Sequence, residues 1–190
     1  ITAIEYVGGG TRAAVIQPDG TIIRAPGYVD GKSDRDVAWR PDGNRIFFSS
    51  DRLENSFNIY RWNLSKATVE RRTFGKIAKM SPSFAVGVPA EGNASPLMVY
   101  SGMAWELDPA NGQAIQIYPT KQGKNAPQDL REGDAQDVSG NALGRGSDAR
   151  VRQARYFGGK TWLAVLIKTD TGETLRVQKV GSDDPKDRMT

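Results

Sequence analysis

The chain has 190 residues, of which 26 are basic and 22 acidic, so its formal net charge is +4, and it contains neither cysteine nor histidine. These two absences exclude disulfides, thiolate metal ligands and every arrangement that depends on an imidazole base within this sequence. Basic and acidic residues are interleaved along the chain, so we expect a mixed solvated surface and no nucleic-acid partner. No apolar run approaches the roughly 20 residues of a membrane span, and none is expected.

Residues 1–26 predict three strands joined by tight turns. The turns are Gly8-Gly9-Gly10 and Asp19-Gly20, and an Asp-Gly pair between two apolar stretches is typical of a β-hairpin. The expected strands are 1–7, 12–17 and 21–24. We interpret them as the second, third and outermost strands of a sheet unit whose innermost strand is missing.

Residues 36–74 predict one complete four-stranded unit. Its first turn is Pro41-Asp42-Gly43: proline presets φ, the Asp42 side chain bonds nearby backbone amides, and Gly43 accepts a positive φ. The stretch 45–49 is apolar on both faces, as expected for a strand covered on both sides. A polar loop at 50–56, a strand at 57–62 and an outer strand at 67–72 complete the unit.

The motif of this unit resembles one repeat of the TolB-like β-propellers, whose blades run W-S-P-D-G, an apolar strand, S-D-R and an I-Y strand. The matching residues are Trp39, Pro41, Asp42, Gly43, Ser50, Asp51, Arg52, Ile59 and Tyr60. Arg40 stands where that family usually has serine, and we take it as a surface position of little consequence. The resemblance implies blades arranged around an axis, protein partners at the ends of the ring, and a periplasmic or cell-surface location.

A third unit is expected at 79–120, with an inner strand at 79–86. The loop 89–93 replaces the tidy Pro-Asp-Gly turn of the preceding unit. Further strands are expected at 97–100, 104–107 and 114–118. Residues 121–148 are mostly polar and predict a long excursion from the sheet without a domain of its own.

A fourth, partial unit is expected at 149–180, followed by a tail at 182–190 that we predict to be disordered or a connector. Its strands are expected at 151–157, 161–168 and 174–180. The chain therefore predicts an all-β fold over residues 1–181: a β-propeller of four-stranded antiparallel meander blades, with about four blades represented, and very little helix. Because the first and last units lack a strand, we expect an incomplete ring and contacts with further parts of the same polypeptide.

The four tryptophans fall at similar places in successive units and are expected to fill the space between blades. Trp105 is the expected exception, because it follows the degenerate turn and stands beside Glu106. Loops on a rigid scaffold can vary without disturbing it, so partner contacts are expected on the 88–95 loop and the 121–148 excursion. The candidate partner-binding residues are Glu91, Asn93, Trp105, Arg131 and Arg145.

The sequence contains no recognisable motif of catalytic residues. Asp34 and Asp36 are the better candidates for a bound cation, but they lack the spacing of a calcium loop. No pair of carboxylates is singled out for glycoside hydrolysis, and there is no Gly-x-Ser-x-Gly elbow. We therefore predict no catalytic residue, no metal and no cofactor.

The leading functional hypothesis is a non-enzymatic protein-interaction scaffold of a bacterial envelope or cell-surface assembly. One alternative is the substrate-gating propeller of a prolyl-oligopeptidase-type serine peptidase, whose catalytic domain would lie outside these residues. Another is a carbohydrate-binding propeller that uses the tryptophans for stacking.

Overall fold

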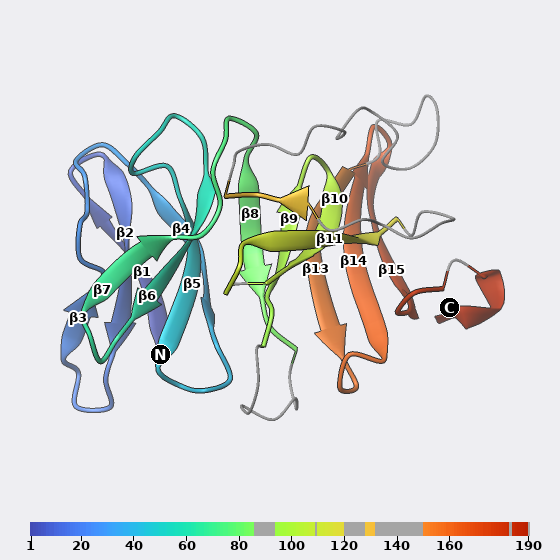
Figure 1. Cartoon of the computed structure of the whole chain (residues 1–190), viewed down its shortest axis with the longest axis horizontal. Helices are drawn as coiled ribbons and strands as arrows, with labels where there is room; N and C mark the ends of the chain where they lie inside the picture. Colours follow the sequence, from blue (N-terminus) through green and yellow to red (C-terminus); the bar gives the residue numbers. More distant parts are fainter. Residues whose placement is uncertain (86–93, 109, 120–127, 132–149, 183, 190) are drawn as a thin grey trace.

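A computed structural model describes residues 1–85, 94–108, 110–119, 128–131, 150–182 and 184–189 (Figure 1). The strands in these ranges form four separate antiparallel sheets, in which the main strands pair with their neighbours in the chain. The helical content of the same ranges is one 3₁₀ turn, Pro185–Asp187. The predicted all-β meander architecture is confirmed, and we call the four sheets blades 1 to 4.

Blade 1 contains three strands and agrees with the predicted hairpins. β1 pairs with β2 and β2 with β3. Gly8, Gly9 and Gly20 take positive φ in the turns, which costs glycine little because it has no Cβ. The bounds are β1 (Thr2–Val7), β2 (Gly10–Ile16) and β3 (Ile22–Arg24).

Blade 2 is the regular four-stranded unit that the sequence predicted. Its second strand, β5, is buried at every position after the first, because apolar side chains of the neighbouring blades cover both of its faces. Ile46 and Phe48 face blade 1, whereas Phe47 faces blade 3. The bounds are β4 (Asp34–Trp39), β5 (Arg45–Ser50), β6 (Asn58–Asn63) and β7 (Thr68–Arg71).

The turn between β4 and β5 confirms the predicted role of Asp42 and corrects that of Arg40. The Asp42 carboxylate accepts the backbone N–H groups of Asn44 and Arg45 at 3.1 and 3.2 Å, and Gly43 has φ 69°. Arg40 is only 7% exposed and donates to the Asp42 carboxylate. Arg40 is therefore buried and does not occupy the expected surface position, because the turn folds its guanidinium back onto the partly exposed Asp42 carboxylate.

Blade 3 has one strand more than expected. β12 pairs with β11 at the outer edge of the sheet, and Leu130, directly after it, is fully buried against this blade. Residues 128–131 therefore belong to the sheet, which corrects the prediction that 121–148 is wholly an excursion. The bounds are β8 (Lys79–Ser83), β9 (Leu97–Tyr100), β10 (Met103–Leu107), β11 (Gln113–Tyr118) and β12 (Gln128–Asp129).

Blade 4 has the outer strand that the sequence did not reveal. The predicted tail returns to the sheet, and its last two described residues pair with β15. Hydrogen bonds hold the return: Gln178 donates to the carbonyl of Ser182 at 2.8 Å, and the Ser182 hydroxyl donates to Asp187 at 2.6 Å. The bounds are β13 (Arg150–Phe157), β14 (Trp162–Thr169), β15 (Gly172–Lys179) and β16 (Arg188–Met189).

Most buried apolar residues in the described part of the chain gather in three clusters, each between two successive blades. Trp62 packs between blades 1 and 2, and Trp105 lies in the cluster between blades 2 and 3. The third cluster joins Tyr118 and Leu97 of blade 3 to Leu163 and Val151 of blade 4. Burial of this kind stabilises by roughly 25 cal/mol per Å² of apolar surface, so the clusters hold the blades face to face.

Blades 1 and 4 lie at opposite ends of the longest axis, with blades 2 and 3 between them (Figure 1). The inner strands β4, β8 and β13 each carry an irregularity near their third residue, a repeat that the sequence does not display. In two of them the irregular residue, Asp36 or Ser81, has positive φ. Among the described residues, no helix is long and apolar enough to cross a membrane.

Candidate functional site

The candidate site lies at the end of the blades where the inner strands begin. β8 and β13 both start at the upper edge in Figure 1 and run downward. In the first two blades this end is formed by the loops at 25–33, 51–57 and 72–78, which connect β3 to β4, β5 to β6 and β7 to β8. We call it the loop end, and the opposite end, which holds the Asp42 turn, the turn end.

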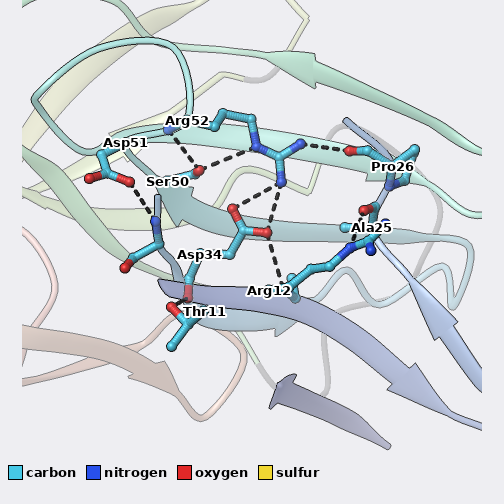
Figure 2. Close-up of polar contacts among 10 residues, drawn as sticks. Thr11, Arg12, Ala25, Pro26, Asp34, Ser50, Asp51 and Arg52 are labelled. Carbon is cyan, nitrogen blue, oxygen red and sulfur yellow. Dashed lines mark hydrogen bonds and ion pairs between the residues drawn. The ribbon is translucent and has the colours of Figure 1, made fainter. Parts of the chain in front are cut away.

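Arg52 is the centre of a buried polar network at the loop end (Figure 2). Its guanidinium donates to both carboxylate oxygens of Asp34 at 2.9 and 2.8 Å and to the carbonyl of Pro26 at 2.7 Å. Its backbone N–H and Nε donate to the hydroxyl of Ser50 at 3.2 and 3.3 Å. The guanidinium also lies 5.0 Å from the ring centroid of Phe48, a cation–π distance.

Asp34 extends this network to blade 1. Its Oδ2 accepts the backbone N–H of Ala13 on β2 at 3.0 Å, and its carbonyl accepts the Thr11 hydroxyl at 2.7 Å (Figure 2). The side chains of Asp34 and Arg52 are only 1% and 4% exposed. A paired charge in such a dry position has strongly constrained geometry, because either partner alone would be a buried unpaired ion. The pair therefore fixes blade 1 against blade 2.

The same network ties two loops together. The Asp51 carboxylate accepts the N–H of Ser33 at 2.7 Å (Figure 2), and the Lys32 ammonium donates to the carbonyl of Glu54 and to Asn55 at 3.2 and 3.0 Å. The 25–33 loop is therefore bonded along its length to the 51–57 loop.

Gly10 allows the 25–33 loop to approach β2. A Cβ at this position would lie 1.9 Å from the carbonyl oxygen of Lys32 and 2.8 Å from the Tyr28 hydroxyl. The backbone itself bonds there, because the N–H of Thr11 donates to the Lys32 carbonyl at 3.1 Å. Glycine is therefore needed at position 10 for space.

Apolar side chains stand exposed on this fixed frame. Leu53 is 64% exposed, and Val29 and Ile77, on the two neighbouring loops, are also exposed. A hollow of about 380 Å³ opens beside Leu53, between the 25–33 loop and β7, with Arg52 and Tyr60 in its lining. A hollow beside an exposed apolar side chain can receive a side chain of another molecule.

The structure places the predicted repeat residues in two different settings. Pro41, Asp42 and Gly43 form the turn at the turn end, whereas Ile59 and Tyr60 are buried in the clusters beside blade 2. Trp39 is half-buried and packs against the cluster between blades 1 and 2. These residues shape the blade and do not line the loop-end hollow, apart from Tyr60.

The predicted partner-binding residues are spread out. Trp105 is only 4% exposed and its indole N–H donates to the carbonyl of Tyr100, so it packs as the other interblade tryptophans were expected to. Arg131 is exposed on the blade 3 edge, where it pairs with Asp129 at 2.7 Å. Glu91, Asn93 and Arg145 lie outside the described residues, as do most of the 88–95 and 121–148 loops.

The burial of the tryptophans also bears on the other hypotheses. Trp62 and Trp105 are inside clusters, and Trp162 is half-buried, with its ring stacked on Phe157 at 6.4 Å between centroids. None of these three offers a fully open platform for a sugar ring. Asp34 and Asp36 are already bonded within the protein, Asp36 to Ser49 and Ser81, and the described residues contain no group of three side chains suited to a metal ion.

Sequence reasoning singled out Ser50-Asp51-Arg52 as a motif but did not identify its partners. The signal that was available is the acidic residue that begins the inner strand, Asp34, 18 positions before Arg52. A buried arginine requires a nearby carboxylate, and Asp34 was considered only as a cation ligand.

Four stacked meander sheets with a TolB-like motif define the class of the protein as a β-propeller type. No family model and no curated protein matches the chain. Among solved structures, TolB from Acinetobacter baumannii is similar at 16% identity with a TM-score of 0.49, covering 90% of this chain and 47% of that one. The tricorn protease is similar at 13% identity with a TM-score of 0.41, covering 90% of this chain and 18% of that one. The chain thus spans about half the length of the TolB chain and less of the protease, and the likeness concerns the fold alone.

Proposed function

We propose that the protein is a non-enzymatic interaction module that binds a protein partner at the loop end of blades 1 and 2. The observation that carries this proposal is the exposed Leu53 beside the 380 Å³ hollow, on loops that the Asp34–Arg52 network holds in place. A surface that is already rigid loses little conformational entropy when a partner binds. The TolB-like motif supports extending the proposal to an assembly of the bacterial envelope or cell surface.

The charged groups around the exposed apolar residues also support protein binding. Glu54 and Arg71 pair at 2.8 Å beside the hollow, and Lys32 lies on the adjoining loop. Interfaces commonly combine a small apolar centre with a polar rim, and the centre contributes most of the binding energy. Leu53 beside the hollow would form that centre here, with Val29 and Ile77 exposed on the two neighbouring loops.

Photo-crosslinking tests the proposal with a matched control. A photoreactive amino acid replaces Leu53 in one variant and Leu175 in another, because Leu175 on β15 of blade 4 is equally exposed, at 66%. Each variant is irradiated in envelope extract of the source organism. We expect a discrete protein adduct from position 53 that is absent from position 175, and adducts of the same kind and yield from both positions would contradict the proposal.

A further inference from the structure

A second hollow at the loop end lies on blade 4 and is lined mainly by basic residues. It has a volume of about 310 Å³, and Arg150, Arg152, Lys168, Thr169 and Asp170 line it. Arg150 begins the inner strand β13, and Lys168 and Thr169 end β14, so the hollow faces the same end of the blades as the candidate site. We call it the blade 4 hollow.

The sheet register brings two of its cations together. Arg150 and Lys168 are directly paired residues of the β13–β14 ladder, where like charges are destabilising. Arg152 lies at the register shift of β13, between Val151 and Gln153, and lines the same hollow. The fold therefore holds three positive charges around one small volume.

Among the described residues, these three cations have no carboxylate partner in an ion pair. Within the described ranges, the ion pairs of blades 3 and 4 include Lys160 with Glu106 at 2.8 Å and Arg131 with Asp129 at 2.7 Å, and none of them involves Arg150, Arg152 or Lys168. Asp170 also lines the hollow, so its described lining residues carry a net charge of about +2 at neutral pH. By contrast, the cations Arg24, Arg61 and Arg71 on the first two blades each have an acidic partner.

The stem of Arg150 lies against the turn of blade 3, although the residue is exposed. Its stem packs over the backbone of Gly102, where a Cβ would lie 3.3 Å from the Arg150 Cγ, and the N–H of Val151 donates to the Gly102 carbonyl at 2.9 Å. Gly102 has φ 72°, which also favours glycine. The turn of blade 3 thus supports the stem of Arg150, one of the residues that line the blade 4 hollow.

We propose that the blade 4 hollow binds a carboxylate side chain from an acidic segment of the protein partner. This inference rests on the proposed function and adds the chemistry of the partner. The hollow is large enough to admit an acidic side chain, and the three cations form a local cluster and not the extended stripe that a nucleic-acid backbone requires. Asp170 favours a peptide, because it can accept a backbone N–H and because it repels a phosphate dianion more strongly than a singly charged carboxylate.

Binding of a fluorescent glutamate octapeptide to the full chain, followed by fluorescence anisotropy, tests this inference. The test variant is Arg152→Gln with Lys168→Gln. The control is Lys66→Gln with Lys179→Gln, which removes the same charge from exposed positions away from the hollow. We expect the test variant to weaken binding on the order of tenfold and the control to change it less than about twofold, because charges away from the hollow attract the peptide only through solvent and are screened by salt. Binding should weaken further as salt is raised.

Competition with other compounds shows whether the hollow prefers a carboxylate peptide or a phosphate ligand. A glutamine octapeptide should not bind, and inorganic phosphate or a single-stranded oligonucleotide should not displace the glutamate peptide at equal charge concentration. Displacement by either phosphate compound, equal losses in the two double variants, or no binding of the glutamate peptide would each overturn the inference.

Crosslinking from position 53 separates this inference from the proposed function. If the adduct at position 53 persists at full yield in the Arg152→Gln, Lys168→Gln variant, the partner docks without the blade 4 hollow and the acidic contact is wrong. If the glutamate peptide binds the hollow but no adduct forms at position 53, the docking site on blades 1 and 2 is wrong instead. A reduced adduct yield in the test variant, with full yield in the control, supports both.

Discussion

Blade 2 has a carboxylate–guanidinium cluster at each of its ends. The two clusters differ in how far apart their residues lie in the sequence and in how many parts of the fold they join. At the turn end, Asp42 pairs with Arg40 and Arg45, which lie two and three residues away in the chain. At the loop end, Asp34 pairs with Arg52 across 18 residues, and the Asp34 carboxylate also bonds blade 1. The first cluster shapes one turn, whereas the second positions two blades and two loops.

The two aspartate–arginine clusters also differ in their exposure to water, and this difference determines what each contributes to stability. The Asp42 side chain is partly open to water, so its ion pairs are screened and its backbone hydrogen bonds define its role. The Asp34–Arg52 pair is almost dry, so removing one member leaves an uncompensated charge. We therefore expect substitutions at the loop end to cost much more stability than those at the turn end.

The largest effect is expected from Arg52→Met. This change leaves the Asp34 carboxylate buried without its partner, which costs about 4 kcal/mol. Urea denaturation of the wild type and the variant measures this loss in the free energy of unfolding. The double variant Arg52→Met, Asp34→Asn is the control, because it removes both charges and should recover part of the loss. If the double variant loses the full sum of the two single changes, the pair is not coupled and the comparison fails.

Gly10→Ala tests the close approach at the loop end without touching a charge. The new Cβ would meet the Lys32 carbonyl oxygen, so β2 or the 25–33 loop must shift, at a cost of about 3 kcal/mol. Gly9→Ala is the matched control, since its Cβ meets open space and only its positive φ of 81° is strained, at about 1 kcal/mol. Thermal unfolding should give Gly10→Ala a clearly lower melting temperature than Gly9→Ala. Equal melting temperatures would contradict the proposed contact.

Asp42→Asn is expected to cost about 1 kcal/mol at neutral pH, through weaker hydrogen bonds at the turn end. Burial opposes ionisation of Asp42, but the Asn44 N–H and the Arg40 and Arg45 charges outweigh it and hold its pKa below the usual range. A depressed folded pKa stabilises the protein above the unfolded pKa of about 3.9, and this contribution is lost as pH falls through the folded value. The wild type and the variant should therefore differ in urea midpoint at pH 7 and converge towards pH 2. A constant difference in urea midpoint between pH 7 and pH 2 would show that Asp42→Asn acts through the shape of the side chain and not through its charge.

The smallest effect on stability is expected from Leu53→Asp. Leu53 is largely exposed on the 51–57 loop, so the free energy of unfolding should change by less than about 0.5 kcal/mol. Partner crosslinking from the neighbouring position 29 should nevertheless fall sharply, because a charge would enter the apolar centre of the contact. Leu175→Asp is the control for exposure. Equal crosslinking yields in the two variants would show that Leu53 is not part of the interface.

Residues close together in sequence made much of the fold predictable. The Asp42-Gly43 turn and the doubly covered strand β5 were recognised from local chemistry and matched the structure. Arg40 was misjudged, because its burial depends on how the turn folds back over it. The added strands β12 and β16 were missed, since two-residue strands carry no periodic pattern and form only where an existing sheet edge accepts them.

The amino-acid sequence by itself determined the meander blades, their order and the apolar residues that fill the space between them, because turn chemistry and strand alternation act over a few residues. The tertiary structure alone decided that Arg52 reaches Asp34 and Pro26, that Gly10 meets the 25–33 loop, and that Arg150 and Lys168 share one hollow. Those contacts depend on how successive sheets stack and on the register of each ladder. Both are set by packing between distant segments, which a pattern of neighbouring residues does not encode.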